Sequence, residues 1–136
     1  MSSRSGYMSL IINLSSFASG ISLVGFGMYT AGKTFNNHHS KACYYELNKS
    51  MDVISIKPMY VETPLSQQKA NWLNVITVDQ LNNSILKQLG HEISTYGHPR
   101  HDWQASLAHY LLPGRNLLGK AIKYVSNLEY WKWNLI

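Results

Sequence analysis

The sequence predicts a mainly α-helical protein. A single N-terminal transmembrane helix is followed by an irregular, mostly helical extramembrane region without a large core of its own. Two observations predict this class. No charged residue occurs between Arg4 and Lys33, and no other stretch is so long and so apolar. The later segments carry apolar residues at helical spacing, and the strand-like run within 52–64 is limited by two prolines.

The predicted transmembrane helix covers residues 7–31. A bilayer core requires about 20 residues at a rise of about 1.5 Å each, and the uncharged stretch is longer. Mean hydropathy from Met8 to Met28 is roughly +1.5 on a Kyte–Doolittle-type scale, near the threshold for a span, because Asn13 and several serines lower it. Two alternatives fit the same stretch: a buried helix of a soluble domain, and a signal peptide cleaved near Ala18-Ser19-Gly20.

A helix over this stretch would have rows that differ in residue size. Large apolar side chains form one row, which we expect to face lipid. Small residues flank it on both sides, and they let helices pack closely in a membrane. Asn13 requires a hydrogen-bond partner there, which indicates a neighbouring chain. The lipid-facing row is Leu10, Leu14, Phe17, Ile21, Val24 and Met28, and the two helix-packing rows are Ser9, Asn13, Ser16, Gly20 and Gly27, and Ser15, Ala18, Ser22 and Gly25.

The remaining chain divides into a polar head at 1–6, a juxtamembrane segment with an extended linker at 32–76, and a helical extramembrane region at 77–136. A helix is predicted to begin after Thr77, because Gln80 stands three residues further on in a capping-box pattern. Its apolar edge is Leu81, Ile85 and Leu89.

An amphipathic helix is predicted over about 116–133, where aromatic residues alternate with lysines. This composition suits either a membrane surface or a docked protein partner. The side chains expected at the membrane interface are Tyr29, Lys33, Tyr124, Tyr130, Trp131 and Trp133.

One segment, Gly27–Thr34, matches the phosphate-binding pattern G-x-x-x-x-G-K-[ST]. A second run, Val75–Asp79, is apolar and ends in an acid, as a Walker B strand does. A P-loop domain also needs a strand before the loop and several further strands, and the chain after Asp79 offers helices instead. We therefore interpret Gly27–Thr34 as the glycine-rich end of the membrane helix, and nucleotide binding is the least favoured alternative.

Other candidates for chemistry are weak. Six histidines occur without the tight pairs typical of zinc sites, and the single cysteine, Cys43, has no recognisable nucleophile motif around it. The seven acidic residues are widely spaced. The sequence thus predicts a protein that is not an enzyme, with no catalytic, cofactor-binding or metal-binding residue.

The net charge of +5 comes from scattered basic residues, not from a dense run, so nucleic-acid binding is not predicted. In general type the chain resembles the small, basic, aromatic-rich accessory subunits of energy-converting complexes in the mitochondrial inner membrane. This resemblance of kind implies a non-catalytic subunit that stabilises a large respiratory-type complex. Its partners would be other membrane subunits and lipids, and its C-terminal part would lie in the matrix or cytoplasm. The alternative is an independent single-span anchor or oligomerising protein, viral or regulatory.

Overall fold

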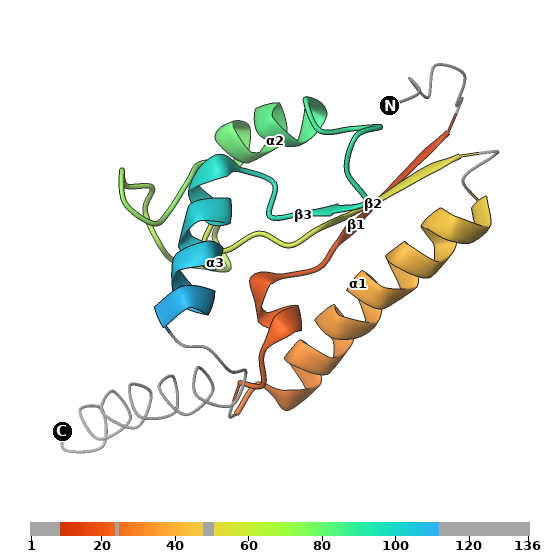
Figure 1. Cartoon of the computed structure of the whole chain (residues 1–136). Coiled ribbons are helices and arrows are strands. Elements are labelled where there is room, and N and C mark those ends of the chain that lie inside the picture. Colours follow the sequence, from red (N-terminus) through yellow and green to blue (C-terminus); the bar gives the residue numbers. More distant parts are fainter. Residues whose placement is uncertain (1–8, 24, 48–50, 112–136) are drawn as a thin grey trace, which may run out of the picture.

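The chain is organised around a three-stranded parallel sheet with helices beside it (Figure 1). A computed structural model describes residues 9–23, 25–47 and 51–111. The strand order is β1-β2-β3, which makes β2 the central strand. The elements along the chain are β1 (Leu10–Leu14), the 3-10 helix η1 (Phe17–Gly20), α1 (Gly27–Leu47), β2 (Asp52–Ile56), α2 (Val78–Leu86), β3 (Ser94–Thr95) and α3 (Pro99–Leu111).

The first two strands and α1 form a β-α-β unit. Parallel strands cannot be joined by a hairpin, so a crossover is required, and α1 supplies it (Figure 1). The register pairs Leu10 with Asp52 and continues to Leu14 with Ile56. Every residue of β2 is buried, which is typical of a strand covered on both faces in a parallel sheet. By contrast, Leu10, Ile12 and Leu14 of the outer strand β1 remain 41, 43 and 55% exposed.

Helix α1 lies on the sheet largely through hydrogen bonds between side chains. Asn37 Oδ1 accepts from Ser55 Oγ at 3.0 Å and from Ser94 Oγ at 3.2 Å, which joins α1 to β2 and β3. Asn13 Nδ2 of β1 donates to Ser40 Oγ at 2.9 Å. The sheet-facing side of this helix is therefore mostly polar, and its buried residues are Thr30, Asn37, Ser40 and Tyr44.

The apolar core lies on the opposite face of the sheet, under α2. It consists of Ile54, Ile56, Ile76, Leu81 and Ile85, with Val61 and Leu89 partly buried against it. The predicted capping box is confirmed: Thr77 Oγ1 accepts from the Gln80 amide at 3.2 Å, and Gln80 Oε1 accepts from the Thr77 amide at 3.1 Å. The predicted burial of Leu81 and Ile85 is also confirmed.

The prediction of a mainly α-helical protein with a transmembrane helix is wrong. The apolar run at the start of the predicted transmembrane helix is β1. The serine- and glycine-rich part that follows it forms η1 and a connecting segment. Gly25 has a φ of +83°, a conformation that does not continue a helix. Helix α1 begins only at Gly27 and carries asparagines, histidines and lysines. Across 9–23, 25–47 and 51–111, no helix combines the length and the apolar character that crossing a bilayer requires. This finding overturns the predicted single-pass placement in the mitochondrial inner membrane.

Two further predictions need correction. Gly27–Thr34, which we interpreted as the glycine-rich end of a membrane helix, forms the first turns of α1, and the Thr30 amide already donates to the Phe26 carbonyl at 2.9 Å. The least favoured alternative, a phosphate-binding loop, does not form there either. Residues 52–56, which we expected in an extended linker, form the central strand. The helix predicted over about 116–133 lies outside the described residues.

Candidate functional site

Polar side chains gather where the three strands end. Ser15 and Ser16 follow β1, Lys57 follows β2, and Tyr96 follows β3. Because the strands are parallel, these ends lie at one edge of the sheet. In open α/β sheets ligands bind outside the carboxyl ends of the strands, so this edge is where a functional site is expected.

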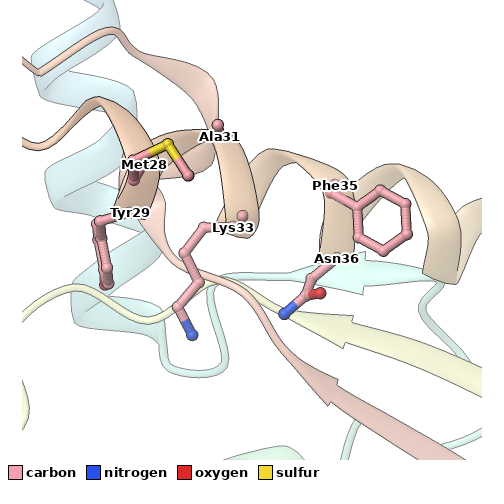
Figure 2. A pocket seen from close by; sticks show the side chains of 7 residues that line it. Met28, Tyr29, Ala31, Lys33, Phe35 and Asn36 are labelled. Carbon is pink, nitrogen blue, oxygen red and sulfur yellow. The ribbon is translucent and has the colours of Figure 1, made fainter.

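Tyr29 and Lys33 come to this edge from the first turns of α1. Their spacing of four residues places them on the same side of the helix, and Figure 2 shows both side chains extending from α1 in the same direction. The Lys33 ammonium lies 5.8 Å from the centroid of the Tyr29 ring. It donates to the Leu14 carbonyl oxygen at 2.9 Å. Tyr29 is 49% exposed, so its ring is accessible to a bound molecule.

A shallow, wide-open hollow on the surface of α1 adjoins this pair (Figure 2). Polar side chains on one side of it combine with apolar side chains on the other, an arrangement that suits a mainly apolar molecule with a polar group. Its lining residues are Met28, Tyr29, Ala31, Gly32, Lys33, Phe35 and Asn36.

A second cation and ring meet at the ends of β2 and β3. The Lys57 ammonium lies 4.5 Å from the centroid of the Tyr96 ring, within the range of a cation–π contact. Burial lowers the pKa of Lys57, with repulsion from Lys41 adding to the effect and Asp102 opposing it. Burial raises the pKa of the Tyr96 phenol, and the Asp102 carboxylate raises it further. Both groups therefore lie in a partly desolvated environment at the sheet edge.

His101 of α3 fixes the segment that follows β2. The side chain is fully buried, with Nε2 3.2 Å from the Tyr60 carbonyl oxygen and Nδ1 3.4 Å from both the Met59 amide and the Tyr96 carbonyl oxygen. A neutral ring protonated on Nε2 donates to Tyr60 and accepts from Met59. Burial lowers the pKa of His101, and the hydrogen bonds that the charged ring would donate to the Tyr96 and Tyr60 carbonyls offset this only in part. The neutral ring is thus the favoured state.

The residues predicted to form rows on one membrane helix lie in different elements. Asn13, Leu10 and Leu14 belong to β1, with Ser9 directly before it and Ser15 and Ser16 directly after it; Phe17, Ala18 and Gly20 belong to η1; Ile21, Ser22 and Gly25 follow; Gly27, Met28, Tyr29 and Lys33 belong to α1. Val24, Tyr124, Tyr130, Trp131 and Trp133 lie outside the described residues. The membrane roles given to these side chains are not tested by the structure.

Sequence reasoning assigned Ser15, Tyr29 and Lys33 to packing and to a membrane interface, and missed that they meet. The structure brings them together because residues 10–14 form a strand. A signal was present: an apolar run of strand length ends in two serines, and a tyrosine and a lysine follow at helical spacing. Lys57, Tyr96 and His101 had no comparable local signal, because only the sheet topology brings them to this edge.

Comparisons with known proteins support the corrected fold. No protein-family model and no curated protein sequence matches the chain. The chain is similar to a solved structure from work on the stereoselectivity of 7β-hydroxysteroid dehydrogenase, with a TM-score of 0.67 and 20% sequence identity. The match covers 84% of this chain and 47% of the other, so the chain spans about half the length of that structure.

This likeness indicates a Rossmann-like fold, the kind of fold that a dehydrogenase uses. It gives no support to the prediction of a non-enzymatic protein. The predicted accessory subunit of a membrane complex is also corrected, because that function depended on a transmembrane helix and the corresponding residues form β1, η1 and the start of α1. The expected partners, membrane subunits and lipids but not nucleic acid, stay predictions.

Proposed function

We propose that the chain carries the proton-donating part of an oxidoreductase site that interconverts a ketone and a secondary alcohol. The observation that carries this proposal is the pairing of Tyr29 with Lys33 beside an open hollow at the carboxyl edge of the sheet. A tyrosine hydroxyl can act as a general acid or base. An ammonium held close to the ring stabilises the negative charge that develops on the phenol oxygen when its proton leaves.

The reduction adds a hydride to the carbonyl carbon and a proton to the carbonyl oxygen. In the proposed site Tyr29 donates that proton, and it accepts the proton again when the alcohol is oxidised. Lys33 is held beside the reacting phenol by the Leu14 carbonyl oxygen. Met28 and Phe35, which are 90 and 66% exposed beside the pair, favour an apolar ketone. The structural neighbour acts on hydroxysteroids by its name, so we propose a ketosteroid as the substrate class.

A reduced nicotinamide dinucleotide would supply the hydride for such a reaction. Its phosphates are usually held by a short glycine-rich turn between a strand and a helix. In the part of the chain that the structure describes, the connection from β1 to α1 contains η1 and an extended segment instead. These residues do not fit a dinucleotide phosphate site, so no described residue is assigned to cofactor binding.

The test is a turnover assay of the purified chain with a 7-ketosteroid and an excess of either NADH or NADPH, supplied free in solution because no described residue is assigned to holding the dinucleotide. The assay follows loss of the reduced nicotinamide. We expect steroid-dependent oxidation, and we expect Tyr29→Phe to lower kcat by about 10²- to 10⁴-fold, the usual contribution of a general acid. Tyr45→Phe is the matched control, because Tyr45 is an exposed tyrosine of the same helix outside the hollow. Equal rates for the wild type and Tyr29→Phe, or no turnover by the wild type with either dinucleotide, would overturn the proposal.

A further inference from the structure

Two consecutive residues at the end of β1 hold Lys33 at both of its ends. The Leu14 carbonyl oxygen accepts a hydrogen bond from Lys33 Nζ at 2.9 Å. Ser15 Oγ donates to the Lys33 carbonyl oxygen at 2.6 Å. One contact therefore places the ammonium, and the other places the turn of α1 from which the side chain extends.

Ser15 is itself fixed on the sheet. Its amide donates to the Ile56 carbonyl oxygen at 2.7 Å, which continues the β1–β2 pairing beyond the last residue of β1. Ser15 is only 2% exposed, so water does not replace its hydroxyl as the partner of Lys33. The side chain thus links the central strand to α1 through a short, buried path.

Other contacts between α1 and the β1 side of the sheet lie elsewhere on the helix. Asn13 binds Ser40 almost two turns beyond Lys33, and Thr34 Oγ1 donates to the Ser19 carbonyl oxygen at 2.9 Å. Asn36 Nδ2 lies 3.5 Å from the Leu14 carbonyl oxygen, a much longer contact than the 2.9 Å of Lys33. Among these contacts, only the one from the Ser15 hydroxyl reaches the backbone of Lys33, at its carbonyl oxygen.

We propose that Ser15 is a positioning residue for Lys33, and through it for the Tyr29–Lys33 pair. The assignment of a role in catalysis rests on the proposed function, whereas the effect on Lys33 does not. Removing the hydroxyl leaves the Lys33 carbonyl only its hydrogen bond within α1, which loosens the hold of β1 on this turn and weakens the contact between the ammonium and Leu14. Tyr29, one turn earlier, then loses its nearby cation.

Ser40 provides a matched control for Ser15. It is also a fully buried serine, and its hydroxyl likewise donates to a helix carbonyl, that of Asn36, at 2.6 Å. Ser40→Ala therefore removes a hydroxyl bond to a carbonyl within α1 and the Asn13–Ser40 bond between β1 and α1, both away from the Lys33 ammonium. A purely structural role for Ser15 would make the two alanine variants behave alike.

The first measurement is competitive acetylation of the folded chain with limiting reagent, with each lysine quantified by peptide mass spectrometry. Lys41 of the same helix is the internal reference, and the partly buried Lys57 reports loss of the fold. We expect Ser15→Ala to raise the Lys33:Lys41 labelling ratio about fivefold, the factor for a hydrogen bond of about 1 kcal/mol. Ser15→Thr, which keeps the hydroxyl, should restore the wild-type ratio. An unchanged ratio in Ser15→Ala, or an equal rise in Ser40→Ala, would overturn the proposal.

The second measurement is steady-state turnover. Ser15→Ala should lower kcat about tenfold with little change in KM, the pattern of an interaction that acts in the transition state. Ser15→Thr should recover kcat, and Ser40→Ala should retain it. The expected labelling result together with an inactive wild type would support the positioning of Lys33 and overturn only the proposed function. An active wild type with unaltered kcat in Ser15→Ala would overturn the catalytic role of Ser15.

Discussion

Replacing Gly97 with alanine is expected to lower the free energy of unfolding by about 2–5 kcal/mol. Gly97 follows β3 with a φ of +82°, a region that costs an L-residue about 1–2 kcal/mol. A Cβ added there would lie 2.8 Å from Leu81 Cδ1 and 3.1 Å from Ile56 Cγ2. Both atoms belong to the apolar core, where overpacking costs about 1–3 kcal/mol. The two costs add because one concerns the backbone and the other the side-chain packing.

Gly90 supplies the matched control, since its φ is +75° and the nearest atom to an added Cβ is Asp52 Oδ2 at 3.9 Å. Gly90→Ala should therefore carry the backbone cost alone. Urea unfolding of both variants, followed by far-UV circular dichroism, gives the two free energies, and equal m-values make them comparable. The reasoning is refuted if the two variants lose the same free energy to within about 0.5 kcal/mol.

Three further changes test other parts of the fold. Asn37→Ala removes the acceptor of two hydroxyls, one of them on the fully buried Ser55, and should cost about 2–4 kcal/mol in urea unfolding; a double-mutant cycle with Ser55→Ala that proves simply additive would contradict this. Thr77→Ala should cost about 1 kcal/mol through loss of the capping oxygen, and Thr77→Ser should recover most of it; similar losses in both variants would show that the cap contributes nothing. For His101, the lowered folded-state pKa means that the unfolded state binds the proton first. Stability is therefore full above about pH 6.5 and is lost as the pH falls through the lower folded-state value. Thermal unfolding across this pH range should show that His101→Gln loses less stability in acid than the wild type does. Superimposable pH profiles of the two proteins would contradict the lowered pKa of His101.

The predictable part of the fold was the part with local signals. Thr77 and Gln80 specify the start of α2 within four residues, and Leu81 and Ile85 mark its buried side. The N-terminal stretch was misread because a short apolar run suits a strand and a buried helix equally. The strand assignment of 10–14 depends on pairing with 52–56, which α1 separates from it in sequence.

The packing of helix α1 on the sheet could not be predicted from its sequence pattern either. A helix on a sheet is expected to show an apolar stripe, but the sheet-facing positions of α1 include Thr30, Asn37 and Ser40. The partners of Asn37 and Ser40 are side chains of β1, β2 and β3. A polar residue that faces a polar partner cannot be distinguished by sequence pattern from one that faces water. For the same reason, the sequence pattern did not predict that Ser15, Tyr29 and Lys33 lie close together.

The outer strand β1 gives the sheet an open side. In the described ranges β1 pairs only with β2. On the face of the sheet opposite α1, the residues that pack with α2 belong to β2 and not to β1. Leu10, Ile12 and Leu14 therefore form an uncovered apolar row beside a row of backbone groups directed outward. Such an edge is a template for adding another strand. The strand most capable of recruiting a further polypeptide thus leads directly to Ser15, so anything that docks along β1 would also border the Tyr29–Lys33 pair.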